Sequence, residues 1–64
     1  MESVREIAKD LLKHVEEAEK AQATAKELFK LAREMGVDVS EQERRMRELA
    51  PRISMMKKAL KKRV

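Results

Sequence analysis

Apolar residues recur every three or four positions over the first half of the chain, and this spacing defines one face of a helix. The series is Val4, Ile7, Ala8, Leu11, Val15, Ala18, Ala21, Ala25, Leu28, Phe29, Ala32 and Met35. In a seven-residue repeat its members fill positions a and d, and three of them widen the stripe at position e. Such a broad stripe is typical of a bundle helix and wider than a strict two-stranded coiled-coil seam. No proline or glycine interrupts residues 3–35, so the pattern predicts one helix there.

A turn is predicted between Gly36 and Ser40. Gly36 is the only glycine, and it stands where a left-handed residue commonly ends a helix. Ser40 followed by Glu43 has the spacing of a capping box, in which each side chain bonds the other residue's backbone amide. Because the link is short, the flanking helices are expected to lie antiparallel.

A second helix is predicted over residues 41–63. Its apolar positions again alternate steps of three and four, at Met46, Leu49, Ile53, Met56 and Leu60. Pro51 lies inside this range, where proline removes a hydrogen bond and kinks the axis. It falls on the solvent side of the repeat, so we favour one helix kinked at Pro51. The alternative is a third helix beginning at Pro51, for which Ala50 would be a poor N-cap.

The expected fold is therefore all-α, a single domain (residues 1–64) formed by an antiparallel hairpin with helices at about 3–35 and 41–63. The two arms differ in length. With the turn centred at residue 38, Val64 reaches only as far as Leu12. The apolar residues that then extend past the second helix are Val4, Ile7, Ala8 and Leu11. Fraying is one interpretation of such an end, but a frayed end has no need of apolar side chains at core spacing.

We expect a second chain to cover this segment. Two hairpins forming a four-helix bundle with twofold symmetry is the common arrangement. The residues expected at the interface are Val4, Ile7, Leu11, Val15, Ala18, Ala25, Leu28, Phe29, Met46, Leu49, Ile53, Met56 and Leu60. The partner is either the chain itself, as a homodimer or higher oligomer, or another helical protein.

The composition supports association. A chain of 64 residues buries only about 60% of its unfolded surface, and small folds gain stability from disulfides, a metal or a partner. Cysteine is absent, which excludes disulfides and thiolate metal sites and fits a reducing compartment. No apolar run approaches the length of a signal sequence or a membrane span. We therefore expect a cytoplasmic protein that does not contact a membrane.

Chemistry at His14, the only histidine, is not expected. A metal site would have to combine it with Asp10 and Glu17, but zinc prefers more nitrogen or sulfur donors. Diiron bundles use Glu-x-x-His, whereas the order here is His-x-x-Glu. We instead expect a partly buried polar residue that fixes helix register. Without a phosphate-binding glycine loop, a cysteine or a Ser/His/acid set, neither an enzyme nor a cofactor is expected.

The charge is unevenly distributed. The chain carries a net +4, and residues 1–38 hold seven basic and nine acidic side chains whereas residues 39–64 hold nine basic and three acidic ones. The nine basic residues are Arg44, Arg45, Arg47, Arg52, Lys57, Lys58, Lys61, Lys62 and Arg63. They could contact RNA or DNA phosphates in a salt-dependent manner.

These basic residues surround the helix, however, and no aromatic residue lies among them for base stacking. Hairpin pairing also sets Lys57 to Lys62 near Glu16, Glu17 and Glu19. Nucleic-acid binding is thus the alternative to a protein-interaction module that scaffolds or regulates a larger assembly.

Overall fold

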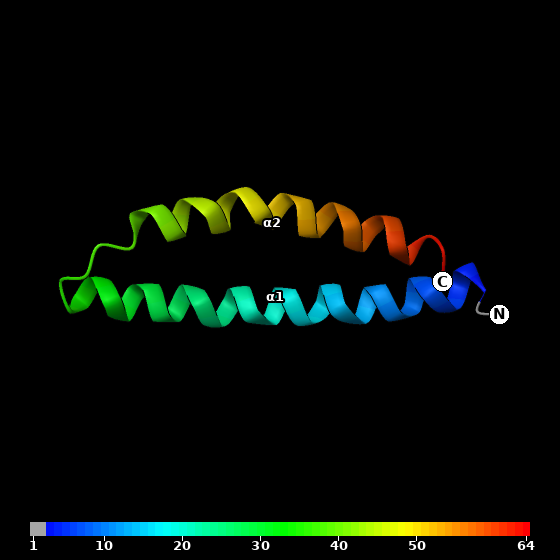
Figure 1. Ribbon diagram of the computed structural model, residues 1–64, viewed down its shortest axis with the longest axis horizontal. Helices are drawn as coiled ribbons and strands as arrows, with labels where there is room; N and C mark the ends of the chain where they lie inside the picture. Colours follow the sequence, from blue (N-terminus) through cyan, green and yellow to red (C-terminus); the bar gives the residue numbers. More distant parts are fainter. Residues whose placement is uncertain (1–2) are drawn as a thin grey trace.

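Two antiparallel helices joined by a short turn make up the structure, a computed structural model that describes residues 3–64 (Figure 1). Helix α1 spans Val4–Glu34 and helix α2 spans Ser40–Lys61. The molecule is 51 Å long and 15 Å across, and its described part contains no strand. The all-α hairpin is confirmed, and each helix begins and ends within two residues of the expected positions.

Helix α1 begins with a side-chain cap that the sequence analysis did not identify. Ser3 has an extended backbone, and its hydroxyl oxygen accepts a 3.2 Å hydrogen bond from the Glu6 amide. This bond satisfies one of the amides that the first turn of a helix leaves without a partner. Glu6 in the first turn and Arg33 in the last also complement the helix dipole.

The end of α1 confirms the expected glycine-terminated turn. Gly36 has a φ of +81°, which places it in the left-handed region. Its amide donates to the Arg33 carbonyl at 3.0 Å, and the Val37 amide donates to the Ala32 carbonyl at 2.9 Å. These two bonds define a Schellman motif. A Cβ added at Gly36 would meet nothing within 4 Å, so glycine is required here by the backbone conformation alone.

The start of α2 corrects the expected capping box. The helix begins at Ser40 itself, and the residue in the N-cap position, Val39, makes no side-chain hydrogen bond. The Asp38 carboxylate instead accepts bonds from the Ser40 amide at 3.0 Å and the Ser40 hydroxyl at 2.6 Å. An ionised carboxylate is a stronger acceptor than a hydroxyl, and aspartate readily bonds the backbone two residues on. Glu43 does not return a bond to the turn, because its carboxylate pairs with Arg33 of α1.

Replacing Asp38 with alanine is expected to lower the melting temperature near neutral pH. Hydrogen bonds from the Ser40 hydroxyl and amide hold the pKa of Asp38 below its usual 3.8. The ionised carboxylate therefore stabilises the fold fully above pH 3.8, and this contribution disappears as the pH falls through the lower pKa of the folded state. The melting-temperature difference between parent and Asp38→Ala should shrink from about pH 6 to about pH 2. Asp10→Ala, which removes the same charge from exposed α1, is the control. A difference for Asp38→Ala that stayed constant with pH would contradict this cap.

Helix α2 runs through Pro51 without a break, so the alternative of a third helix is excluded. Pro51 is exposed, as its place in the repeat predicted. Figure 1 shows α2 bowed, with its convex side turned away from α1 and its C-terminal end approaching α1. Proline has no amide to donate, and because Pro51 lies on the outer side, water can bond the carbonyl that is left without a partner. The bend brings the C-terminal end of α2 toward α1 at the end of the hairpin opposite the turn.

The core between the two helices is small. Ala8, Val15 and Ile53 are the buried apolar residues, at 2%, 9% and 9% exposure. Ala8 corrects the prediction that the whole segment from Val4 to Leu11 lacks intramolecular cover. The chain continues past α2, and its C-terminus lies beside the N-terminal part of α1 (Figure 1). The other apolar residues of that segment remain exposed, with Val4 at 69%, Ile7 at 44% and Leu11 at 48%.

Candidate functional site

An apolar groove runs along one side of the hairpin. It consists of two hollows of about 350 and 380 Å³ that share Ala18 and Ile53. The hollow farther from the turn is lined by Leu11, His14, Val15, Ala18, Ile53, Met56, Ala59 and Leu60. The hollow toward the turn is lined by Ala18, Ala21, Gln22, Ala25, Phe29, Gln42, Arg45, Met46, Leu49 and Ile53. Because the two hollows share residues, the groove is continuous over most of the length of α2.

The groove exists because the stripe of α1 is wider than the surface that α2 covers. Val15 and Phe29, at position e, are buried and half-buried beneath α2, and Ala8, at the same position of the repeat, is buried near the end of the chain that follows α2. Positions a and d lie to one side of this contact, and most of their large side chains remain in solvent. Leu28 is 59% exposed, and Met35 at the end of the stripe is 72% exposed. Exposed apolar surface of this extent commonly marks an interaction site.

The residues predicted for an oligomer interface divide into three groups. Val15 and Ile53 are each 9% exposed and contribute to the core of the hairpin, and both also line the groove. Half-buried positions at the floor of the groove are Ala18, Ala25, Phe29, Met46 and Leu60. Exposed positions are Val4, Ile7, Leu11, Leu28, Leu49 and Met56. The structure thus leaves eleven of the thirteen residues at least partly accessible to a partner.

The predicted interface left out two exposed apolar residues near the turn, although Met35 belongs to the apolar series found in the sequence. Leu31 and Met35 are 52% and 72% exposed. Leu31 occupies position g, the flank opposite position e, and its place in the repeat could have shown that it lies away from α2. Together with Leu28 they form an exposed apolar group near the turn, which complements the exposed group of Val4, Ile7 and Leu11 at the other end of α1.

His14 is far more exposed than predicted. Its side chain is 75% exposed, and its Nδ1 atom lies 3.9 Å from the Glu17 carboxylate. The prediction of a partly buried residue is wrong because α2 packs against position e, whereas His14 at position d lies on the rim of the groove. Within residues 3–64, no group of three His, Cys, Asp or Glu side chains is placed to hold a metal ion.

Two ion pairs join the helices on the flank opposite the groove. Lys57 Nζ lies 2.8 Å from Glu19 Oε1, and Arg33 pairs with Glu43. The Glu19 carboxylate raises the pKa of Lys57 through this hydrogen bond and its charge. The Lys57–Glu19 pair confirms a hairpin centred on residue 38. None of these four residues lines the groove. The flank that carries them has a separate hollow of about 360 Å³ with a largely charged lining, formed by Lys26, Phe29, Arg33, Glu43, Met46 and Arg47. The two sides of the hairpin therefore differ in chemistry, one charged and the other apolar.

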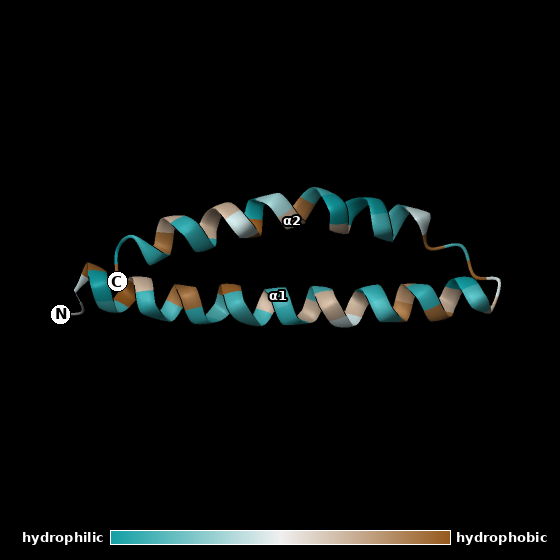
Figure 2. Ribbon diagram, turned by 180° about the vertical axis from the view of Figure 1, so that it is seen from behind, coloured by the Kyte–Doolittle hydropathy of each residue, from teal (hydrophilic) through white to brown (hydrophobic). Residues whose placement is uncertain are grey.

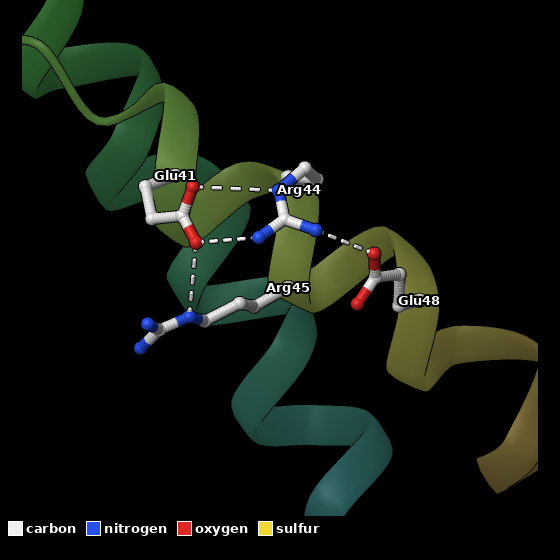
Figure 3. A network of polar contacts seen from close by, with 4 residues as sticks. All are labelled: Glu41, Arg44, Arg45 and Glu48. Carbon is white, nitrogen blue, oxygen red and sulfur yellow. Dashed lines mark hydrogen bonds and ion pairs between the residues drawn. The ribbon is translucent and has the colours of Figure 1, made fainter.

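Three of the nine basic residues proposed for nucleic-acid contact are engaged within the hairpin. Arg44 bonds Glu41 and Glu48, and Arg45 lies 3.3 Å from Glu41, in the network shown in Figure 3. Lys57 is the third, through Glu19. The remaining six form no ion pair with the described residues and are exposed: Arg47, Arg52, Lys58, Lys61, Lys62 and Arg63.

Neither helix in residues 3–64 is long and apolar enough to cross a membrane. No protein-family model matches this chain, and no curated protein or solved structure matches it either.

Proposed function

We propose that this chain is a non-enzymatic interaction module that associates with a second copy of itself through the apolar groove, forming a four-helix bundle. The observation that carries the proposal is the continuous groove, flanked by large exposed apolar side chains on both helices. As an interaction module, the chain is proposed to scaffold or regulate a larger assembly. The cytoplasm is its proposed location, and the absence of cysteine supports a reducing compartment.

The energetics of the isolated hairpin support this proposal. Three buried apolar residues form its core, whereas ordering a chain costs about 1.5 kcal/mol per residue. Full burial of a leucine, isoleucine or methionine contributes about 1.5–3 kcal/mol. The half-exposed side chains along the groove therefore hold much of the apolar burial still available to this sequence. A second hairpin would bury them without any change in the first.

A solution mass measured at two protein and two salt concentrations tests the proposal. Sedimentation should give a dimer or larger species at micromolar protein, and dilution should shift it toward the monomer. The assembly should persist in high salt, because screening weakens exposed ion pairs and leaves apolar contacts intact. A monomer at all micromolar concentrations would overturn self-association and favour a different helical protein as the occupant of the groove.

Nucleic-acid binding is the second candidate. The six basic residues within 47–63 that form no ion pair with the described residues favour it. They could contact phosphates from a surface that the groove does not use. Binding of this kind would be salt-dependent and largely independent of sequence. A fluorescent RNA or duplex DNA titrated at about 50 mM salt, the low end of the usual range, tests this candidate directly. Absence of binding at this salt concentration would eliminate it.

A further inference from the structure

Resting on the proposed self-association, we propose a specific arrangement for the dimer. The two α1 helices pack antiparallel against each other, centred between Glu19 and Lys20, and the two turns lie at opposite ends of the bundle. The occupant of the groove is thus a second copy in one defined orientation. The argument rests on the order of large and small residues along the exposed stripe of α1.

The exposed stripe of α1 matches the same stripe of a second copy that runs in the opposite direction. An antiparallel copy centred between Glu19 and Lys20 places Val4 opposite Met35, Leu11 opposite Leu28 and Ala18 opposite Ala21. Positions a and d meet in this manner in antiparallel helix pairs. Large exposed residues therefore meet near both ends, and alanines meet in the middle. Figure 2 shows the same symmetry, with strongly hydrophobic bands toward both ends of α1 and paler ones between them.

The alanines at the centre allow the close approach that the end contacts need. The distance between packed helices is set by the side chains at their crossing, and it falls to the lower end of about 8–10 Å where these are small. Ala21 is exposed and Ala18 is half-buried, and both line the groove. A crossing there brings two straight helices into contact along their length.

Only this arrangement covers the N-terminal part of α1. If both turns lay at the same end, α1 would pack on the partner's α2, which ends at Lys61 and is followed by three residues only. Within one hairpin the chain end beside the N-terminal part of α1 leaves Val4 and Ile7 69% and 44% exposed, and the equivalent end of a partner would leave them largely in solvent as well. The antiparallel α1 pair instead places them against the turn end of the other α1, where Met35 is 72% exposed.

Charge favours the competing arrangement, but weakly. It would bring the acidic residues of α1 near the basic end of the partner's α2, whereas the antiparallel α1 pair directs the two basic ends toward opposite ends of the bundle. Apart from Lys57, which is half-buried, these lysines and arginines are exposed, and exposed ion pairs contribute much less than burial of large apolar side chains. Long basic side chains also turn their charged ends into water. The apolar match therefore determines the arrangement.

Crosslinking of single-cysteine variants tests the arrangement, because the parent chain has no cysteine. Leu11→Cys mixed with Leu28→Cys should form a covalent dimer on mild oxidation. Neither variant should crosslink alone, since its two cysteines would be about 25 Å apart along the helix axis, beyond disulfide reach. Leu28→Cys mixed with Leu49→Cys is the matched control, because these positions meet between chains only when both turns lie at one end.

A second variant keeps the test valid if loss of a leucine weakens the dimer. Ala21→Cys lies close to the proposed twofold axis and preserves a small side chain, so it should crosslink to itself. The solution mass of the unsubstituted parent, measured separately, tests the proposed self-association. A dimeric parent whose Ala21→Cys variant does not crosslink, or whose Leu28→Cys and Leu49→Cys variants crosslink together, would overturn this arrangement and leave self-association standing. A monomeric parent would overturn both.

Discussion

Replacing Ile7 and Leu11 together with glutamate is expected to convert the proposed dimer into a folded monomeric hairpin. Both side chains are about half exposed, at 44% and 48%, so the hairpin accepts a charge at either position. Each of these side chains would bury its exposed half in the proposed dimer, so replacing it forfeits about half of the ~1.5–3 kcal/mol of full burial, or about 1 kcal/mol. Twofold symmetry gives four such sites, and an unpaired buried carboxylate adds a desolvation penalty. The total of at least about 4 kcal/mol corresponds to a roughly thousand-fold weaker dimer.

Sedimentation and circular dichroism together provide the measurement. The mass should fall to that of one chain while the helical signal is largely retained. Lys9→Gln with Lys13→Gln is the matched control, because it lowers the net charge of the same segment by the same two units at exposed positions. A control that dissociates as readily as the glutamate variant would assign the effect to charge and contradict an apolar interface.

Replacing Ile53 with alanine is expected to unfold the protein at a much lower temperature. Ile53 is 9% exposed and is the one buried apolar residue that α2 contributes to the core. Isoleucine-to-alanine substitutions in cores cost about 2–5 kcal/mol. Because the core here is thin and alanine favours helix, we expect the lower half of that range. In a chain of this size, about 2–3 kcal/mol lowers the melting temperature by roughly 10–20 °C.

Thermal unfolding at one fixed protein concentration checks this prediction, since the stability of an oligomer depends on concentration. Met55→Ala is the control, because Met55 lies on the same helix at 70% exposure and its truncation should change stability by less than about 0.5 kcal/mol. An Ile53→Ala variant that dissociates without losing helix would place Ile53 in the interface between chains, contrary to its position in the hairpin core.

The elements of the fold follow from local chemistry that is readable in the sequence. Gly36 ends α1 because only glycine takes a left-handed conformation there at no steric cost. Pro51 is accepted within α2 because the heptad places it on the outer side. The cap of α2 was misassigned, because Asp38 and Ser40 are both good acceptors and the sequence does not show which one the turn geometry favours.

The candidate site was only partly predictable. The sequence identifies a broad apolar stripe on α1, but a stripe does not state which of its edges the neighbouring helix covers. The structure packs α2 against position e, so Val15 becomes core while Leu11 and Leu28 stay exposed. His14 was placed wrongly for the same reason. Ala8 was misjudged because simple helical reach ignores the bend of α2 and the end of the chain beside α1.

By itself, the sequence determined that two helices form, where the turn lies and how the arms pair, because these depend on periodicity, one glycine and the hairpin register. The Lys57–Glu19 pair obeys that register. Only the tertiary structure decided which apolar residues the hairpin buries and which it leaves exposed. The physical reason is that burial depends on how one helix is rotated about its axis against the other. That rotation is fixed by the sum of many weak contacts, which no short segment of sequence encodes.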